Sequence, residues 1–530
     1  MNSGKTSPLN MTGQRQVSLR HQLAYGGGNL LGSGALAISG AWLLYFYTTF
    51  CGLTLIEAAF IFSVASIIDA ISNPLMGYLT DNFSRTKLGK RFGRRRFFLM
   101  LGAPLMMFYP LLWVEGFGFW YYLVTYVTFE LIYTSVMVPY ETLATEMTDN
   151  FTLRSKLTGY KAIFGKLANF LAAFIPGQYI LIFGKDSAQP FFLTGLTYGV
   201  ILFVAIGCLY TSTWEKSTPA EQDNNDNAPR TVTGTLLSLA KDMSSTFHLR
   251  VFRKHLGMYL CGFGAEWLFA SIFTYFVIFV LQHDPAMVAG LNSLNSILQL
   301  FSTALFIGVC VKYGFSRPYI MALSVVMVAV LFYTALWFFH LPVHSATILM
   351  FAITVLFGLG TGGVYYIPWT VYTFLADVDE VFTGRRREGI YAGAMTFAGK
   401  ILRSAIVFVM GAILSYYGFQ SKAHTQPDSA VTAIAVVFCV GVIILALAAV
   451  IFSSQMKLNR RTHLVVLEEV SRVKAGGKLE DISPEARRVI EELVGHPYEN
   501  CWGNSKLFSK DKANTTDSAV VAAPAASTRH

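Results

Sequence analysis

The sequence predicts an all-α polytopic membrane protein in which twelve transmembrane helices form two bundles of six. Composition is the first reason: 54% of the 530 residues are hydrophobic, 14% are charged and the mean hydropathy is +0.48. Second, two sets of six long apolar runs flank one polar stretch, STPAEQDNNDNAPRTVTGT, a layout typical of duplicated transporters. Third, basic residues gather in alternate loops, as in proteins that cross a membrane repeatedly.

The first bundle is expected at residues 25–214, after an N-terminal segment at 1–24 that lacks the features of a signal peptide. Its first run, near 25–50, is rich in glycine and serine. Small residues allow close helix packing, so this run predicts a tightly packed helix, a substrate-lining helix, or both. The five further runs lie near 55–82, 96–115, 119–147, 160–184 and 190–214.

The polar stretch makes residues 215–254 a linker, with a short amphipathic helix expected after it. The second bundle is expected at 255–455, with runs near 256–282, 287–311, 318–340, 345–375, 389–417 and 430–454. Residues 456–530 form a charged tail. Two short helices are expected in it, one ending at Gly476 and one that begins with Ser483 as its N-cap and Pro484 in its first turn.

The loop charges predict the orientation in the membrane. Between residues 51 and 453 the predicted outer loops hold only Lys185 and Lys422, whereas the other loops hold most of the lysines and arginines. By the positive-inside rule the basic loops, the linker and both termini are cytoplasmic. The net charge of +10 therefore does not indicate a nucleic-acid partner; the expected surroundings are membrane lipid. The six cysteines lack metal-ligand spacing, so no bound metal is expected apart from a coupling Na⁺.

The second run carries an acid near its middle. Burying an ionised Asp69 in hydrocarbon costs roughly 3 kcal/mol or more, so such a residue is functional by default. On a helix Ser66, Ser72 and Asn73 share its face, and Pro74 leaves a backbone carbonyl free on the same turn. This oxygen-rich face predicts a cation site, and the alternative is a structural partner for a basic residue on another helix.

Three motifs resemble the glycoside-pentoside-hexuronide:cation symporters, the family of the melibiose permease within the major facilitator superfamily. DAISNPLMG followed by TD and a basic loop is similar to the family's second helix. TYVTFELIYTSVMVPYETLATEMT is similar to its fourth, and Arg387 and Glu388, twelve residues before Lys400, to its eleventh. The resemblance implies a major facilitator fold and cation-coupled import of a sugar or glycoside by alternating access, in a bacterial inner membrane.

The resemblance also assigns a cation site. Asp69 and Asn73 occupy the positions of the family's two cation-site carboxylates, and Thr134 that of a threonine that completes the site. Because Asn73 replaces an acid, the coupling ion remains open between H⁺ and Na⁺. Glu130, one turn before Thr134, can compensate, since a buried carboxylate can carry a proton whereas a hard cation wants several oxygens, to which Ser72 would contribute.

Two cations in the eleventh run bear on the substrate. Lys400 matches the lysine with which the family couples its substrate and cation sites, and Arg403, three residues on, lies beyond that match. A second cation facing a cavity favours an acidic sugar, a uronide or oligouronide, through bidentate pairing. In the alternative, both cations only neutralise Asp69 and Glu130.

Two positions depart from the family's sugar site. Its acidic sugar-binding position in the first helix aligns with Ser33, and its aromatic stacking position in the fourth helix aligns with Glu141. A site of unmodified melibiose type is therefore not expected. Glu141 lies near the inner end of its helix, where a salt bridge at the gate is as consistent with the sequence as substrate contact.

Further candidates lie in the second half of the chain. Glu266 in the seventh run is equally consistent with substrate contact and with a structural ion pair. Tyr365 and Trp369 could stack on the face of a sugar, although aromatic residues in spans also serve simply for packing.

A loop motif is expected to act as a charge latch at the cytoplasmic gate. It resembles the motif that the superfamily carries between its second and third helices, and it comprises Gly77, Asp81, Gly93, Arg94 and Arg95.

Three functions are compatible with these observations: a cation-coupled sugar importer, a lysolipid carrier of the same superfamily, and a sugar sensor that does not transport. The aromatic candidates and the paired cations favour a sugar. The tail at 456–530 is too small for the output domain of a sensor. An enzyme is not expected, because the sequence holds no nucleophile elbow, phosphate loop or cluster of metal ligands.

Overall fold

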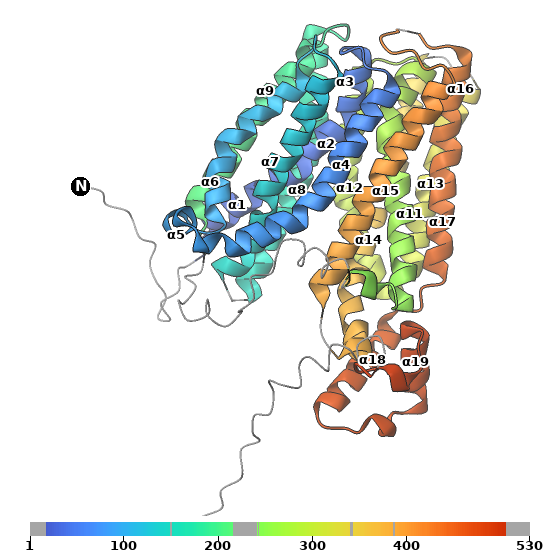
Figure 1. Cartoon of the computed structure of the whole chain (residues 1–530). Helices are drawn as coiled ribbons and strands as arrows, with labels where there is room; N and C mark the ends of the chain where they lie inside the picture. Colours follow the sequence, from blue (N-terminus) through green and yellow to red (C-terminus); the bar gives the residue numbers. More distant parts are fainter. Residues whose placement is uncertain are drawn as a thin grey trace, which may run out of the picture.

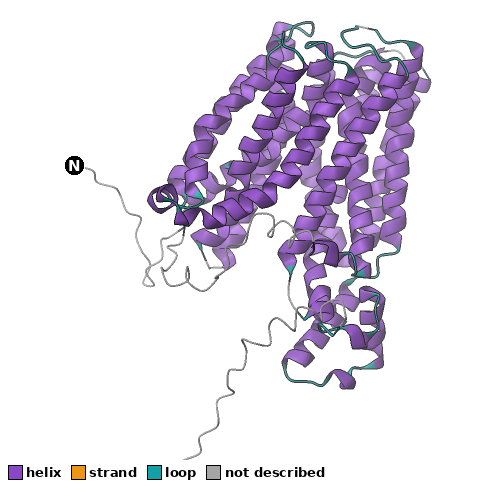
Figure 2. Ribbon diagram, in the orientation of Figure 1, coloured by secondary structure: helices purple, strands orange, loops and turns teal. Residues whose placement is uncertain are grey.

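The computed structural model describes residues 17–148, 151–215, 241, 243–339, 343–384, 387–423 and 425–504. Within these residues every regular element is a helix, as Figure 2 shows. Twelve helices are long and apolar enough to cross a membrane. The predicted all-α polytopic fold is confirmed. Most of the expected linker and its amphipathic helix, and the ends of the chain at 1–16 and 505–530, lie outside the described residues.

The first half of the chain supplies six spans. The first is a succession of short segments, α1 (Leu19–Gly27), η1 (Leu30–Ala35), α2 (Leu36–Ile38), η2 (Ser39–Leu43) and α3 (Leu44–Thr49). The others are α4 (Leu55–Asn82), α6 (Arg96–Leu105) continued by η4 (Met106–Trp113), α7 (Phe119–Met147), α8 (Phe151–Phe183) and α9 (Gln189–Ser212). The short helix α5 (Lys87–Phe92) precedes α6.

The second half also supplies six spans. They are α11 (Arg250–Tyr275) continued by η6 (Phe276–Val280), α12 (Pro285–Tyr313), α13 (Ser316–Phe338), α14 (Val343–Thr383), α15 (Glu388–Tyr416), and α16 (Asp428–Val436) continued by η7 (Val437–Gly441) and α17 (Val442–Ser454). Figure 1 shows these spans beside those of the first half.

The first span is irregular because two of its segments, η1 and η2, are π-helical. Tyrosines of α7, α9 and η4 donate hydrogen bonds to its backbone carbonyls: Tyr140 to Tyr25, Tyr198 to Leu30 and Tyr109 to Ala35, at 2.9, 2.9 and 3.2 Å. Two of the three acceptors, Leu30 and Ala35, belong to the π-helical segment η1, where such bonds can complete the hydrogen bonding of the backbone.

The small residues of the first span permit this close approach. A Cβ atom added at Gly34 would lie 1.5 Å from the Tyr198 hydroxyl, so no larger residue fits there without a shift. The glycine-rich run therefore packs tightly, which was one of its two expected roles.

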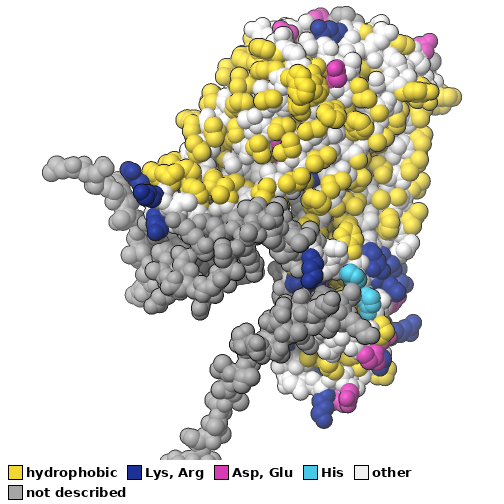
Figure 3. Space-filling view, viewed as in Figure 1, with side chains coloured by type: hydrophobic (Ala, Val, Ile, Leu, Met, Phe, Trp, Pro, Cys, Tyr) yellow, Lys and Arg dark blue, Asp and Glu magenta, His cyan; other side chains and the backbone are white. Residues whose placement is uncertain are grey.

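The two halves meet along two helix pairs, α4 against α15 and α8 against α12. We call the end of the bundle that carries Arg94–Arg96 the basic end, and the end that carries Lys185 and Asp284 the Lys185 end. In Figure 1 the halves lie close together at the Lys185 end, near α3 and α16, and diverge toward α5 and the basic end. Figure 3 shows hydrophobic side chains over the body of the bundle and clusters of charged ones toward the basic end.

Hydrogen bonds and an ion pair join the halves at the Lys185 end. Lys185 of the α8–α9 loop pairs with Asp284, which precedes α12. The Thr48 hydroxyl is 3.1 Å from the Tyr275 hydroxyl, and the Thr48 carbonyl accepts a hydrogen bond from the amide of Lys422 at 3.0 Å. At the basic end, by contrast, the pairs Arg94–Glu146, Arg387–Asp379, His463–Asp377 and Lys474–Glu380 each lie within one half.

A small helical module follows the last span and docks on α14 at the basic end. It contains α18 (Arg460–Lys474) and α19 (Pro484–Val494), and the Ser483 hydroxyl caps α19 by accepting the Ala486 amide, which confirms the two helices expected in the tail. His463 Nε2 lies 2.8 Å from Asp377 Oδ2 of α14. The described chain thus ends at the basic end, where α1 also begins.

Candidate substrate and cation site

Helix α4 carries the central acid of the site. A capping box starts this helix, because Thr54 accepts the Glu57 amide and the Glu57 carboxylate accepts the Thr54 amide at 2.8 Å. Asp69 follows in the middle of the 28-residue helix, with only 6% of its surface exposed. An acid at this depth requires polar partners.

Three side chains from three helices contact the Asp69 carboxylate, and a fourth, Ser72, lies beside them. The Thr134 hydroxyl of α7 donates to Oδ1, the Asn73 amide donates to the same oxygen at 3.1 Å, and the Lys400 ammonium of α15 forms an ion pair with Oδ2. The Ser72 hydroxyl lies 3.5 Å from that of Thr134 and donates to the Asp69 backbone carbonyl at 3.1 Å. Both halves of the protein therefore contribute to one polar cluster.

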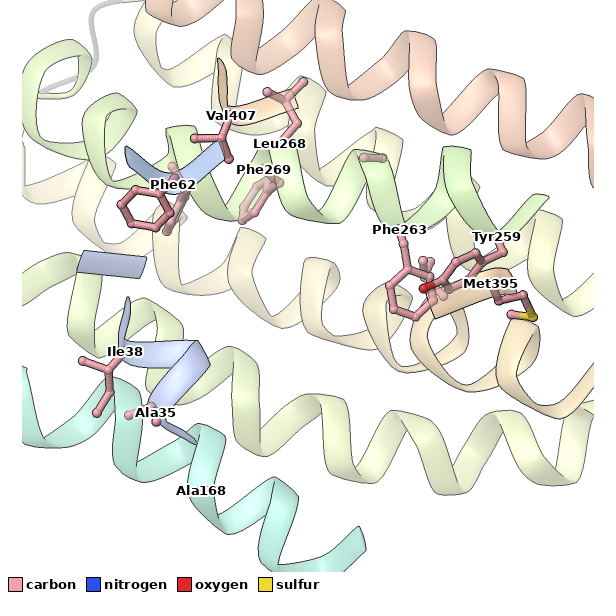
Figure 4. Packing of buried hydrophobic residues seen from close by; sticks show 14 of the residues in the cluster. Ala35, Ile38, Phe62, Ala168, Tyr259, Phe263, Leu268, Phe269, Met395 and Val407 are labelled. Carbon is pink, nitrogen blue, oxygen red and sulfur yellow. The ribbon is translucent and has the colours of Figure 1, made fainter. Parts of the chain in front are cut away.

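A cavity adjoins this cluster at the boundary between the halves. Its polar lining comprises Ser66, Asp69, Tyr126, Glu130, Tyr133, Lys400, Arg403 and Ser404. Glu130 is buried, and Tyr126 lies one turn earlier on α7. Apolar residues such as Phe62 and Val407 complete the wall, and Figure 4 shows these two side chains near each other.

Arg403 enters this cavity from α15 and faces the first span. Its Nη2 atom is 3.0 Å from the position that a Cβ atom of Gly40 would occupy. Among the described residues no carboxylate lies within 4 Å of its guanidinium, and neither Asp69 nor Glu130 forms an ion pair with it. Lys400 and Arg403 therefore differ: the first is paired with Asp69, and the second is not paired.

Aromatic side chains of α11 and α14 form a cluster against Gly399 of α15. The Tyr365 ring packs edge-on against Phe263 at 5.1 Å, and Trp369 packs edge-on against Tyr259 at 5.8 Å. Figure 4 shows Tyr259 and Phe263 next to each other. A Cβ atom at Gly399, the residue before Lys400, would lie 2.7 Å from the Tyr259 hydroxyl. Trp369 is 38% exposed, so part of its ring is open to contact.

Three other predicted residues lie outside the cavity lining. Glu266 is buried in α11 at 5% exposure, and its Oε1 has no hydrogen-bond partner among the described residues. Ser33 is half-buried, and its hydroxyl would be 3.0 Å from a Cβ atom at Gly165 of α8. Glu141 pairs with Lys161 of α8 and half of its side chain is exposed, which matches the salt-bridge alternative for this residue.

The loop motif forms a network at the basic end of the first half. Arg94 and Arg95 both pair with Glu146 near the end of α7. The Glu215 carboxylate accepts the amides of Arg94 and Arg95 at 3.0 and 2.8 Å.

The glycines of this motif differ in their surroundings. Gly93 adopts a φ of +93°, which a residue with a side chain rarely adopts, and an added Cβ atom would lie 2.9 Å from Glu215 Oε1. A Cβ atom at Gly77 would meet nothing within 4 Å. The side chain of Asp81 is not described.

Lys166 and the cavity tyrosines Tyr126 and Tyr133 are not among the residues predicted from the sequence. Lys166 lies in the middle of α8 and donates a hydrogen bond to Gln299 of α12 at 2.9 Å. The signal that identified Asp69, an ionisable residue within an apolar run, applies equally to Lys166. The tyrosines carried no comparable signal, since tyrosine is common in spans.

A twelve-span all-helical bundle with buried ionisable residues at the boundary between two halves defines the class of major facilitator transporters. A family model described as MFS/sugar transport protein matches residues 24–460, and the chain belongs to this family. The protein is thus a membrane transporter and not an enzyme.

Curated relatives are similar over most of their length. The chain is 25% identical to an uncharacterized symporter of Synechocystis over 78% of this chain and 89% of that protein. It is 24% identical to a glucuronide carrier protein homologue of Escherichia coli K12, over 83% of this chain and 93% of that protein. The crystal structure of a D-xylose-proton symporter has a TM-score of 0.55 at 14% identity and covers 80% of this chain and 96% of that one, a likeness that shows the fold.

Proposed function

We propose that this protein is a cation-coupled symporter that imports an acidic sugar, a uronide, across a bacterial inner membrane. H⁺ or Na⁺ is the coupling ion, and its site is the cluster of Asp69, Asn73, Thr134 and Ser72. Membrane lipid surrounds the bundle, with the basic end and both termini in the cytoplasm. Transport proceeds by alternating access, in which the two halves open in turn to either side of the membrane.

The observation that carries the acidic substrate is the unpaired guanidinium of Arg403. Asp69 already has a cationic partner in Lys400, so Arg403 is not needed to neutralise it. Arg403 is only partly exposed, and a partly desolvated guanidinium favours a carboxylate partner. A substrate carboxylate would supply the missing partner, with two hydrogen bonds in the fork geometry of a guanidinium.

The neighbourhood of Arg403 suits a sugar. Tyr126, Tyr133 and Ser66 line the same cavity and offer hydroxyl groups, and the aromatic cluster with Tyr365 and Trp369 packs against Gly399, the residue before Lys400. The relative named as a glucuronide carrier homologue also supports a carboxylate-bearing sugar. The uptake test below also distinguishes this function from the two alternatives, a lysolipid carrier and a sensor.

The same geometry explains how the cation and the substrate could be coupled. The Lys400 ammonium is paired with Oδ2 of Asp69. The ammonium must therefore move away before a coupling cation can bind this oxygen or a proton can neutralise it. Lys400 and Arg403 both line the cavity, three residues apart on one face of α15. A displaced Lys400 would add a positive charge near the substrate site and strengthen binding of an anion.

The first prediction concerns Arg403. We expect R403Q to lower kcat/KM for methyl glucuronide by about 10- to 100-fold, because a charge-assisted hydrogen bond is worth roughly 1.5–3 kcal/mol. Uptake of methyl glucoside, the neutral analogue of the same shape, should change far less. Labelled uptake into proteoliposomes, with Na⁺ and pH gradients imposed separately, measures both and identifies the coupling ion.

The control for this experiment is R403K, which keeps the charge and loses the fork geometry. It should retain a preference for the glucuronide, though a weaker one. An equal loss for both sugars in R403Q, or a wild-type preference for the glucoside, would exclude the acidic substrate. No gradient-driven uptake of any sugar would indicate a lipid carrier or a sensor instead.

The second prediction tests the orientation. Arg91 at the basic end and Lys185 at the opposite end are both exposed, whereas Arg94 and Arg95 are largely buried and unsuitable as reporters. In intact cells an impermeant maleimide should label K185C but not R91C, and R91C should react after permeabilisation. The reverse pattern would place the basic end outside.

A further inference from the structure

Lys166 is a second cation at the boundary between the halves. It belongs to α8 of the first half, yet its contacts lie in the second half: its ammonium donates to Gln299 Oε1 of α12 at 2.9 Å and lies 5.9 Å from the centre of the Tyr365 ring of α14. No carboxylate oxygen of the described residues lies within 4 Å of it. An amide oxygen and a ring face solvate an ammonium only in part.

Lys166 and Arg403 form a complementary arrangement. Each is a cation without a carboxylate partner among the described residues, and each reaches from one half of the protein toward the other. Lys166 extends from the first half toward α12 and α14, whereas Arg403 extends from the second half toward the first span. Figure 1 shows that their helices, α8 and α15, lie in different halves.

Gly165, the neighbour of Lys166, and the Arg403 guanidinium pack at different positions along the first span. Gly165, next to Lys166, packs against the Ser33 hydroxyl, whereas the Arg403 guanidinium packs against Gly40. These contacts on the first span are seven residues apart, which corresponds to about 10 Å along a helix at a rise of 1.5 Å per residue. Gly165 therefore lies about two helical turns along the first span from the contact of Arg403, and the Lys166 side chain extends from this level to Gln299 and Tyr365.

We infer that Lys166 is a specificity-determining residue that binds a second acidic group, so that the preferred substrate is an acidic oligosaccharide with carboxylates on two sugar units. This inference rests on the proposed function. One carboxylate pairs with Arg403 and the other with Lys166, which exchanges its hydrogen bond to Gln299 for the stronger charged one. Tyr365, in contact with the Lys166 ammonium, offers a ring face to the sugar unit that carries the second acid.

The test compares digalacturonate with galacturonate as substrates of the full-length protein in proteoliposomes. For the wild type we expect kcat/KM to be about tenfold or more higher for the dimer, the gain that one charge-assisted hydrogen bond supplies. In K166M this ratio should fall close to one, and K166R should preserve it. R403Q should lower kcat/KM for both substrates.

Q299L is the matched control, because it removes the hydrogen-bond partner of Lys166 and leaves the charge. It should keep the preference for the dimer, whereas a role of Lys166 in holding α8 against α12 would make Q299L and K166M behave alike. Equal losses for both substrates in K166M, or a wild-type ratio at or below one, would overturn the inference. If K166M is not recovered from the membrane, K166Q gives the same comparison.

Failure of the proposed function has a different signature. In that case R403Q would affect acidic and neutral sugars equally, whatever the substitutions of Lys166 do. A protein that prefers galacturonate through Arg403 but gains nothing from a second acid would retain the proposed function and contradict only the role of Lys166.

Discussion

Replacing Asp69 by asparagine is expected to abolish accumulation of substrate against its gradient, while exchange of substrate across the membrane continues. Asp69 is the acid around which Asn73, Thr134 and Lys400 assemble, and it is the ionisable group of that cluster that a coupling cation or proton could neutralise. Without this carboxylate, the coupling ion does not bind one conformation of the transporter more tightly than another, so its gradient cannot drive uptake. Labelled substrate should then equilibrate across the vesicle membrane and no longer concentrate inside.

The control for this variant separates coupling from stability. D69N leaves the Lys400 ammonium, whose side chain is 24% exposed, without its carboxylate, which lowers stability. The double variant D69N/K400Q removes both charges and should recover thermal stability in detergent without recovering accumulation. Concentrative uptake at the wild-type level by D69N would contradict the assignment of the cation site.

A reversible disulfide between α4 and α15 is expected to stop transport. The Ser63 hydroxyl donates to the Ser404 carbonyl at 3.1 Å and the Ser404 hydroxyl donates to the Ser63 carbonyl at 3.0 Å, so these residues lie directly against each other across the two halves. Serine and cysteine are close in size, and a disulfide needs Cβ atoms about 3.5–4.5 Å apart. Oxidation of S63C/S404C should lower uptake by about tenfold or more, because alternating access requires the halves to separate at the Lys185 end.

Reduction with dithiothreitol should restore uptake in the same vesicles, which makes the oxidised and reduced double variant its own control. The six native cysteines are unpaired in the structure, and the single variants S63C and S404C show whether oxidation acts through them. If mass spectrometry finds complete cross-linking and uptake persists, the contact between α4 and α15 does not open during transport.

Much of the fold could be predicted because the solvent for this chain is a lipid bilayer. Each span must satisfy its own backbone hydrogen bonds, so apolar runs of sufficient length become helices and their number can be counted from the sequence. The same holds for Asp69 and Asn73, which are four residues apart on α4 and share a face in any helix. The capped helix after Ser483 is equally local.

The irregular first span shows where local patterns fail. Its glycines predicted close packing, but nothing in the run indicated π-helical segments at Leu30–Ala35 and Ser39–Leu43. The hydroxyls of Tyr109 and Tyr198, from other helices, bond to carbonyls of the first of these segments. The conformation of a segment whose backbone hydrogen bonds come partly from other helices cannot be predicted from the residues of that segment alone.

By itself, the sequence determined that this protein is a twelve-span transporter with an acid at the middle of its second span and two cations on one face of its eleventh. It could not determine which charge is paired with which, because ion pairing depends on separations across helices that are hundreds of residues apart in the chain. Only the tertiary structure joined Lys400 to Asp69, left Arg403 unpaired among the described residues, and turned Lys166 toward the second half. The physical reason is that the interaction energy of a buried charge depends on the groups within a few ångströms of it, and helix packing decides which groups those are.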